Sequence, residues 1–492
     1  MPIDLSRDAF DELAATAAVP HYDPAALKAG IVHFGVGNFH RAHQAVYLDD
    51  LFNLGLDHDW GLIGAGVRPG DDAMRLKLEA QNWLTTVVEQ EADASTARVT
   101  APMIGHLPVG DSAAIIAQLA EPAIRIVSLT ITEGGYYIDP ATQAFDPTHP
   151  EIAWDAQNIA APRTVFGLIL AGLRARRDAG IAPFTVMSCD NIPGNGHVTQ
   201  NSVAGLAELV DPELARWVRS SVAFPNGMVD RITPATTDRE RALLRETFGI
   251  ADRWPVFCET FKQWVLEDNF PLGRPALEKV GVQFVPDVAP FEHMKIRILN
   301  GGHATIAYPA ALLDIHFVHE AMENALVRGF LETVEREEII PIVPPVPDTD
   351  LDDYYALIDR RFSNPKIGDT ISRLCLDGSN RQPKFILPSA ADRIAQGKGV
   401  AGLALVSAFW ARYCYGTSDS GRTIAPNDPN WTRLSETAKR AKDDPAAWLG
   451  MTDIFGRLAR EPAYVAAFSH ALRTIWATGT KATLEAYLAG RL

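Results

Sequence analysis

The spacing of apolar residues changes once along this chain of 492 residues, near residue 291, and that change limits the folds open to it. Before residue 291, short β-rich runs alternate with helical patterns, as in the buried run Gly30–Gly35 followed by the amphipathic segment His40–Leu54. Strands that alternate with helices form a mainly parallel, doubly wound sheet. After residue 291, apolar residues recur at helical spacing without convincing strand patterns. The sequence therefore predicts an α/β chain, with a doubly wound domain over residues 1–290 and an all-α domain over residues 291–492.

The same patterns predict the individual elements of both domains. In the first domain we expect further strands at Trp60–Val67, Trp83–Val88, Ala97–Val99, Ile124–Ile131 and Phe184–Ser188, and helices at Asp71–Gln81 and Arg163–Ala179. In the second domain we expect helices at Val318–Glu338, Asp350–Arg361, Gly402–Tyr415 and Tyr464–Leu488. The proline-rich segment Ile339–Pro347 favours a stiff extended connector between helices.

Charge and cysteine usage narrow the cellular setting. The chain carries 45 Lys and Arg against 61 Asp and Glu, a net charge of −16, which disfavours nucleic-acid and anionic-membrane binding. No apolar run is long enough to span a membrane, and the acidic N-terminus does not resemble a signal peptide. The four cysteines are far apart, as expected for reduced thiols rather than disulfides or a zinc site. We therefore expect a cytoplasmic protein, and the sequence leaves open whether it is a monomer or a small homo-oligomer.

A glycine-rich turn follows the first predicted strand and precedes a helix. It consists of Gly35, Val36, Gly37, Asn38 and Phe39. At such a turn, glycines let the backbone approach a pyrophosphate, whose negative charge is favoured at the start of the following helix. His40 stands where the usual pattern has a third glycine, and a glycine turn by itself is often only a turn. The position of this turn between strand and helix favours a dinucleotide site.

The end of the second predicted strand is where the adenosine ribose of a dinucleotide would lie. An acidic residue there binds the ribose hydroxyls and selects NAD, whereas a basic residue accommodates the phosphate of NADP. This chain has Arg68 after the strand, followed by Asp71 and Asp72. The sequence leaves the choice between NAD and NADP open at this point.

Lys295–His303 combines three side chains suited to catalysis within nine residues. In a helix of about 100° per residue, Asn300 lies about 140° and His303 about 80° around from Lys295, so all three fit on one side. An amine, an amide and an imidazole on one wall can remove a proton from an alcohol and stabilise the resulting alkoxide. The alternative is a solvated lysine, an Asn-Gly turn and an incidental histidine.

Five motifs occur in order over some 270 residues of the chain. They are Gly35–Gln44, Thr130–Tyr136, Ser188–Gly196, Phe224–Pro234 and Lys295–His303. Together they resemble the polyol-specific long-chain dehydrogenases, and the resemblance covers nearly the whole chain. It implies a Rossmann-type first domain, a helical second domain, and a zinc-independent oxidation of a sugar alcohol by NAD, with NADP still possible.

The resemblance also implies roles for individual residues. It implies Lys295 as the general base, Asn191 and Asn300 as the pair that holds the alkoxide, and His303 as a residue that orients the substrate. Asp230 and Arg373 match positions expected to contact substrate hydroxyls, and Glu133 lies in a loop expected near the nicotinamide. The match departs at Gly301-Gly302, where relatives often have Gly-Ser, which leaves the chemistry intact but predicts a looser local backbone.

Most of these residues also have a simpler structural interpretation. Asp190-Asn191 before Ile-Pro-Gly is a good turn sequence, and Glu133 is also suited to a turn. Asp230-Arg231 can form a local ion pair, and Arg373 can cap or pair on a helix surface. His33, His43 and Cys189 are better explained by packing than by ligand binding.

The residue types support this chemistry without the resemblance. Hydride removal from a carbinol carbon requires an acceptor, a base and stabilisation of negative charge. The sequence has no His, Cys and Glu cluster with zinc-ligand spacing and no Tyr-x-x-x-Lys pair, which leaves Lys295 as the leading base. A free lysine titrates at about 10.4, so burial or a nearby positive charge is expected to lower the pKa of Lys295.

The resemblance implies oxidation of a secondary alcohol to a ketose, with D-mannitol and D-fructose as the expected pair. One alternative is a fructuronate or tagaturonate reductase of the same family, which would bind a carboxylate through Arg373, Arg381 and Lys384. Another is a nucleotide-binding sensor without activity, although such a protein has little need for Lys295 and its neighbours.

Overall fold

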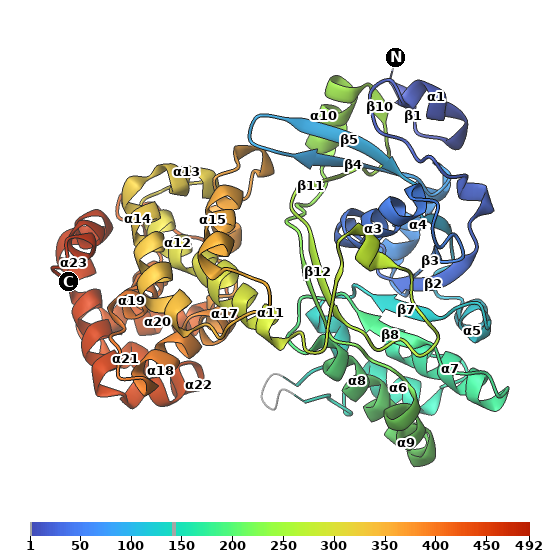
Figure 1. Cartoon of the computed structure of the whole chain (residues 1–492). Coiled ribbons are helices and arrows are strands. Elements are labelled where there is room, and N and C mark those ends of the chain that lie inside the picture. Colours follow the sequence, from blue (N-terminus) through green and yellow to red (C-terminus); the bar gives the residue numbers. More distant parts are fainter. Residues whose placement is uncertain (1, 140–143) are drawn as a thin grey trace. The chain divides into compact units, whose positions relative to one another are not determined.

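A five-stranded parallel sheet organises the first part of the chain in the computed structural model, which describes residues 2–139 and 144–492 (Figure 1). Its strands are adjacent in the order β6 (Met103–His106), β3 (Gly61–Ala65), β2 (Ala29–Phe34), β7 (Ile126–Leu129) and β8 (Thr185–Ser188). All four pairings are parallel. Counted along the chain this is the order third, second, first, fourth, fifth, which is the doubly wound order of dinucleotide-binding folds. The predicted α/β fold class is therefore confirmed.

Both faces of this sheet are buried, which explains the continuous apolar runs of its strands. Ile31 and Ile126 belong to one hydrophobic core, while their neighbours Val32 and Val127 belong to another. Helices α3 (Gln44–Asn53) and α4 (Pro69–Glu79) contribute to the first core. Helices α5 (Ser112–Ala120), α7 (Val165–Asp178) and α8 (Asn195–Val210) contribute to the second.

Smaller sheets complete the first unit, Met1–Ala289. One has the order β11 (Val256–Glu259), β4 (Thr85–Gln90), β5 (Ser95–Thr100), and another has β13 (Gln283–Val285), β12 (Gln263–Glu267), β9 (Gly227–Asp230). Strands β4 and β5 were expected, but they lie outside the five-stranded sheet and pair antiparallel. The remaining elements are β1 (Ile3–Asp4), η1 (Arg7–Ala9), α1 (Phe10–Leu13), η2 (Pro24–Ala26), η3 (Glu133–Tyr136), α6 (Pro150–Gln157), α9 (Pro212–Ser221), α10 (Asp238–Phe248), β10 (Ile250–Ala251) and η4 (Leu277–Val280).

The helix predicted at His40–Leu54 starts earlier and is broken. It consists of α2 (Asn38–Ala42) and α3, separated at His43, whose backbone angles of φ −120° and ψ −88° are not helical. The His43 ring is buried, hydrogen-bonded to the Gln263 carbonyl at 2.9 Å and stacked against Phe39. These contacts account for the break, because they hold the ring against β12.

In the second unit, Pro290–Leu492, the regular elements of the described residues are all helices, and β-pairing is limited to isolated bridges such as Phe317 with Thr370. Helix α19 (Ala401–Tyr413) is buried on almost all sides and packs against α12 (Gly301–Leu312) and α23 (Pro462–Leu488). The other elements are α11 (Ala289–Met294), η5 (Lys295–Asn300), α13 (Val318–Glu323), α14 (Ala325–Thr333), η6 (Val334–Ile339), η7 (Ile340–Ile342), α15 (Leu351–Phe362), η8 (Pro365–Ile367), α16 (Ile371–Leu374), α17 (Gly378–Phe385), α18 (Leu387–Ala395), α20 (Trp431–Ala441), α21 (Ala446–Leu449), α22 (Thr452–Phe455) and η9 (Gly456–Arg460).

Two expectations for this unit are corrected. The helix predicted at Val318–Glu338 is interrupted at Asn324, whose side chain accepts hydrogen bonds from the Leu326 and Val327 amides and so caps a new helix. The predicted extended connector Ile339–Pro347 begins instead with the short helix η7 and becomes extended at Val343.

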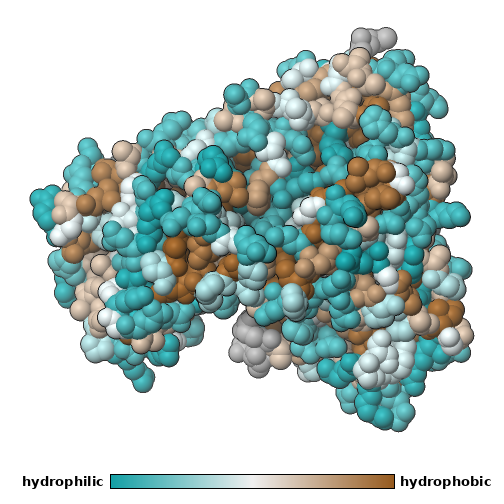
Figure 2. Space-filling view, in the orientation of Figure 1, coloured by the Kyte–Doolittle hydropathy of each residue, from teal (hydrophilic) through white to brown (hydrophobic). Residues whose placement is uncertain are grey.

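Hydrophilic residues cover most of the molecular face shown in Figure 2, with apolar residues in scattered patches. Within residues 2–139 and 144–492, the structure contains no helix with the length and apolar character that a membrane crossing requires.

Candidate active site

The turn Gly35–Gly37 connects β2 to α2 and has a shape that requires glycine. Gly35 has φ +90°, and a Cβ atom there would lie 2.1 Å from the Thr130 carbonyl oxygen. Thr130 Oγ1 donates a hydrogen bond of 2.6 Å to the Gly35 carbonyl, and His33 Nε2 lies 2.9 Å from the same hydroxyl. A Cβ atom added at Gly37 would have its nearest neighbour 3.9 Å away, so this backbone can be approached closely.

His40 occupies the position of the third glycine in the usual pattern, and its ring is accommodated by stacking. Its ring is buried and stacked on His33, with centroids 3.5 Å apart and planes 15° apart. Burial and the neighbouring His33 hold the pKa of His40 well below its usual value, so the stacked pair is uncharged. The first helical residue, Asn38, is anchored by donating to the Pro234 carbonyl at 3.1 Å and to Thr236 Oγ1 at 2.9 Å.

This turn fits a dinucleotide. No side chain caps the start of α2, because Gly37 precedes it, so the first backbone amides of the helix are not occupied by a capping group. The turn leaves the sheet at β2, between β3 and β7, where the order of strands reverses. Pyrophosphates bind at such a position in doubly wound folds.

At the end of β3, the alternatives for ribose binding are partly resolved. Asp71 Oδ2 accepts hydrogen bonds of 2.9 Å from the backbone amides of Val67 and Arg68. A Cβ at Gly66 would lie 2.4 Å from Asp71 Cβ, so that glycine makes room for the carboxylate. Asp72 forms an ion pair with Arg75 at 2.9 Å. Arg68 is exposed beside Asp71, and these two residues are the ribose-side candidates.

Glu133 and Asn191 follow neighbouring strands of the same sheet. Glu133 is exposed at the start of η3, after β7, and Asn191 is exposed after β8. Because β2, β7 and β8 are adjacent and parallel, their carboxyl ends place the cofactor turn, Glu133 and Asn191 along one edge of the sheet. Sequence reasoning missed the residue that joins the last two loops, Asp190, which it treated as part of a turn.

The Asp190 carboxylate accepts three hydrogen bonds from the loop after β7. They come from the Ile131 amide at 2.9 Å, the Thr132 amide at 2.9 Å and the Tyr136 hydroxyl at 2.7 Å. Burial raises the pKa of this carboxyl, whereas the donated hydrogen bonds act in the opposite direction.

Asp230 ends β9 and is buried, in register with Gln263 of β12. Its neighbour Arg231 is also buried and forms an ion pair with Glu89. The Arg231 guanidinium also donates to the carbonyls of Glu259 at 2.9 Å and Ala42 at 2.6 Å. The Arg231 guanidinium is thus held by Glu89 and by two backbone carbonyls.

In the second unit, Lys295–Asn300 forms a π-helix between α11 and α12, which corrects the uniform α-helix used to place these residues. The Gly301 amide accordingly donates to the Ile296 carbonyl, five residues back. In an α-helix, residues four apart lie over one another; in a π-helix, residues five apart do. The wider turn therefore places Asn300 over Lys295 instead of well around the helix from it.

Gly301 and Gly302 do not loosen the backbone as expected, because they begin the regular helix α12. A Cβ at Gly302 would lie 3.2 Å from Glu335 Oε1 of η6, so this glycine permits close packing of the two segments. Glu335 is fully buried, and burial holds the pKa of its carboxyl well above the usual value.

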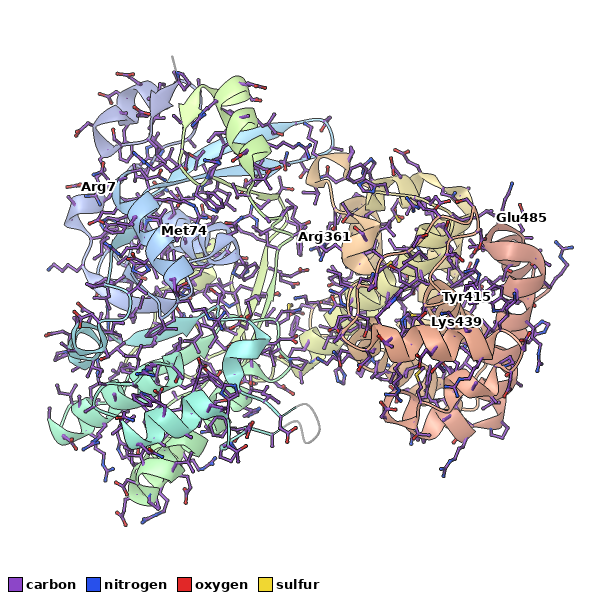
Figure 3. The ribbon with its side chains drawn as sticks, turned by 180° about the vertical axis from the view of Figure 1, so that it is seen from behind. Arg7, Met74, Arg361, Tyr415, Lys439 and Glu485 are labelled. Atoms are coloured by element: carbon purple, nitrogen blue, oxygen red, sulfur yellow. The ribbon has the colours of Figure 1, made fainter. Side chains whose placement is uncertain are left out.

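His303 lies one turn of helix after Asn300 and stacks on Phe362 of α15, with centroids 4.1 Å and planes 13° apart. Burial lowers the pKa of His303 to about 3, and the nearby Arg373, Arg361 and Arg381 act in the same direction. Arg361 lies on α15 and is labelled in Figure 3. His303 is therefore a neutral imidazole at physiological pH.

Arg373 of α16 is paired with Asp369, both Nε and Nη2 donating to the carboxylate. The Arg381 guanidinium donates to the Leu374 carbonyl at 2.9 Å and the Arg373 carbonyl at 3.3 Å. Of the three cations that would hold a substrate carboxylate, two are therefore already engaged. Among the described residues, no cluster of three or more His, Cys, Asp or Glu has an arrangement that could hold a metal ion.

The structure thus brings the predicted residues together in two groups. The first unit aligns Gly35–Phe39, Glu133 and Asn191 along one edge of the sheet. Asp230 belongs to the same group and lies at the end of β9. The link to β9 is Asn195, which exchanges hydrogen bonds of 2.9 and 2.8 Å with the Gly227 backbone. The second unit gathers Lys295, Asn300, His303 and Arg373 around η5 and α12.

Comparison with known proteins places both units in one family. The family model described as the mannitol dehydrogenase Rossmann domain matches residues 29–279, and the model described as the mannitol dehydrogenase C-terminal domain matches residues 287–476. The mannitol 2-dehydrogenase of Cereibacter sphaeroides is 62% identical over 471 residues, which cover 96% of this chain and 98% of that protein. The mannitol 2-dehydrogenase of Aspergillus terreus is 42% identical over 478 residues, covering 96% and 95%.

Solved structures of polyol dehydrogenases are also similar to this chain over nearly its whole length. The Pseudomonas fluorescens mannitol 2-dehydrogenase, solved as a ternary complex with NAD and D-mannitol, aligns with a TM-score of 0.88 and 41% identity over 99% of this chain and 100% of that one. A D-sorbitol dehydrogenase in its substrate-free form aligns with a TM-score of 0.90 and 34% identity, covering 98% and 100%.

Proposed function

Because this chain belongs to the mannitol dehydrogenase family and is an NAD-dependent oxidoreductase acting on CH–OH groups, we propose that it oxidises D-mannitol to D-fructose. The observation that carries the proposal is the 62% identity to a mannitol 2-dehydrogenase over 96% of the chain. The site supports it, since it offers an anchored dinucleotide turn and a segment that combines an amine with an amide. The engagement of Arg373 by Asp369 also favours an uncharged polyol over a sugar acid.

The cofactor would be held by residues of the first unit. Gly35–Phe39 would receive the pyrophosphate on the backbone of the turn, Arg68 would lie at the ribose end, and Glu133 would lie near the nicotinamide. When bound, NAD supplies the acceptor for the hydride that leaves the carbinol carbon.

The remaining chemistry falls to side chains. In the proposed mechanism Lys295, as an uncharged amine, accepts the proton of the reacting hydroxyl. The side-chain amides of Asn191 and Asn300 donate hydrogen bonds to the alkoxide, and each such donor typically contributes about 3 kcal/mol to transition-state stabilisation. The π-helix supports the pairing of Lys295 with Asn300, because it places them over one another.

His303, Asp230 and Arg373 would position the polyol. With a pKa of about 3, His303 is a poor proton acceptor at neutral pH, so we assign it to orientation rather than to sharing the proton with Lys295. Its stacking on Phe362 fixes the ring plane. Asp230 and Arg373 would contact substrate hydroxyls distant from the reacting carbon.

We also propose that the enzyme acts in the cytoplasm, as its four free cysteines suggest a reducing compartment.

A panel of substrates and cofactors tests the proposed function. Reduced-nicotinamide absorbance is followed with D-mannitol, D-arabinitol, D-sorbitol and mannonate, each with NAD and with NADP. We expect the highest kcat/KM with D-mannitol and NAD. Strong activity with mannonate alone would contradict the polyol assignment, and a preference for D-sorbitol or D-arabinitol would contradict mannitol as the substrate.

A further inference from the structure

Asp190 is bonded to two loops that carry proposed active-site contacts. Its carboxylate holds the Ile131 and Thr132 amides of the loop after β7. Its backbone carbonyl accepts from the Ile192 amide at 2.9 Å, which closes a tight three-residue turn with Asn191 at its centre. One residue therefore fixes both the loop that presents Glu133 and the turn that presents Asn191.

Further hydrogen bonds connect the Asn191 turn to the surrounding structure. The Asp190 carbonyl also accepts from Asn195 Nδ2 at 3.1 Å, and the Asp190 amide donates to Ser188 Oγ at 3.2 Å. Asn195 is the residue that holds the Gly227 backbone, at the start of the strand that ends at Asp230. The contacts of Asp190 thus reach each segment of the first unit that presents a proposed substrate contact.

The loop held by Asp190 contains a strained residue. Thr132 has φ +65° and ψ 163°, a region that is populated almost only by glycine and is unfavourable for a β-branched side chain. Such a conformation persists only where the surroundings enforce it, and it concentrates at functional sites. The Thr132 amide is one of the donors to Asp190, so the carboxylate is placed to enforce it.

The three hydrogen bonds that the side chain of residue 190 accepts also explain why this residue is acidic. Asp190 is 8% exposed, and an ionised carboxylate has only acceptor sites, which match three donors converging on it. An asparagine would direct its amide group at one of those donors. The fold has another way of stabilising its core near this point, since Tyr136 packs on Phe166 at 5.4 Å.

We propose that Asp190 is a positioning residue for catalysis, which holds the Thr130–Tyr136 loop and the Asn191 turn as one rigid unit at the ends of β7 and β8. The inference rests on the proposed function, because it takes Glu133 and Asn191 to be the cofactor and alkoxide contacts. It predicts that loss of the carboxylate impairs the site more than it impairs the fold.

The test compares Asp190→Asn with a matched control, Asp155→Asn. Asp155 is also buried in the first unit and accepts from two successive backbone amides, Arg163 at 2.7 Å and Thr164 at 2.9 Å, as well as from the Thr164 hydroxyl. It holds the two residues that precede α7, of which Thr164 is the N-cap, and carries no proposed contact with cofactor or substrate. Both variants lose a comparable set of hydrogen bonds, so their difference isolates positioning from stability.

Four measurements are made on each full-length variant: amide hydrogen exchange of the peptide covering residues 130–136, NADH affinity by fluorescence, kcat and KM for D-mannitol, and Tm. For Asp190→Asn we expect at least tenfold faster exchange of this peptide, at least fivefold weaker NADH binding and at least a tenfold lower kcat. For Asp155→Asn we expect a similar fall in Tm, with exchange of that peptide, NADH affinity and kcat each within about twofold of the wild type.

Asp190→Glu keeps the negative charge on a side chain that is longer by one methylene. It should fold even if Asp190→Asn fails to fold, and we expect exchange rates and kcat between those of the wild type and Asp190→Asn. Equal effects of the Asp190 and Asp155 variants, or normal kcat and exchange in either Asp190 variant, would overturn the inference. Failure of the proposed function is distinguishable, because it would appear as inactivity of the wild type toward polyols. Exchange and NADH affinity would still decide the role of Asp190 in that case.

Discussion

The charge state of His303 separates its proposed role from that of Lys295. Burial keeps His303 neutral, and the positive charges of three nearby arginines also disfavour protonation of its ring. A neutral imidazole donates from one nitrogen and accepts at the other, which suits it to orienting a hydroxyl. Lys295 is then the remaining side chain of this segment able to take the proton.

Replacement of Lys295 tests this assignment. For Lys295→Ala we expect kcat to fall by about 10²- to 10⁴-fold, the usual contribution of a general base, with NADH affinity nearly unchanged. Stopped-flow turnover and fluorescence titration measure the two quantities. Lys384→Ala, at an exposed position on α17, serves as the control and should retain wild-type kcat. Near-normal turnover of Lys295→Ala would remove that residue from the role.

Among the elements, the turn from β2 to α2 imposes the strictest steric requirement. Gly35 combines a positive φ with a Cβ position 2.1 Å from the Thr130 carbonyl oxygen. Gly55, at the end of α3, also has a positive φ, of +75°, but nothing lies within 4 Å of its Cβ position. The two positions share a backbone conformation that is unfavourable for other residues, and they differ in whether an added Cβ atom would clash.

Gly35→Ala should therefore displace the turn, whereas Gly55→Ala should show the cost of the backbone conformation alone. We expect NADH binding to weaken at least tenfold in Gly35→Ala and to stay within twofold of wild type in Gly55→Ala. Isothermal titration with NADH measures both affinities. Equal affinities in the two variants would show that the contact with Thr130 does not shape the cofactor site.

The elements also show how far the sequence could be interpreted. All four strands predicted from buried apolar runs in the central sheet occur, because short continuous apolar runs are typical of strands covered on both faces. The edge strand β6 and the strands β9, β11, β12 and β13 lacked a comparable periodic signal. The break at His43 depends on Gln263, which is 220 residues away, and no local pattern reveals it.

The sequence was equally uneven as a guide to the candidate site. The glycine turn and Lys295–His303 were recognised from residue types and spacing, whereas the π-helix that aligns Lys295 with Asn300 has no recognisable signal in the amino-acid sequence. Asp190 was assigned to a turn because its partners lie 54 to 59 residues away, in another loop. The roles of the site residues themselves stay predictions until variants are measured.

At the scale of the whole molecule, buried histidines link stability to pH. Burial lowers the pKa of both His33 and His43 to about 3, whereas an unfolded histidine titrates at about 6.5. Below that value the unfolded chain binds protons that the folded chain does not. The stability from these neutral rings is thus full above about pH 6.5 and is lost progressively as the pH falls toward 3.

His43→Phe isolates one such contribution, because phenylalanine can keep the stacking on Phe39 but cannot be protonated. Between pH 7 and pH 5, His43 should account for about 2 kcal/mol of the fall in the free energy of unfolding of the wild-type first unit. Urea denaturation of both proteins at the two pH values measures it. The variant should lose that part of the pH dependence, and identical slopes would contradict the neutral state of His43.

The four thiols have a practical consequence for work on this enzyme. Cys189, Cys258, Cys375 and Cys414 are all buried and free, and burial raises the pKa of each thiol. Alkylating and oxidising reagents attack exposed thiolates, so the native protein presents them with almost no target. A single cysteine introduced on the surface would then be the one reactive position. The wild-type chain can therefore carry a dye or spin label at a chosen point without prior removal of its own cysteines.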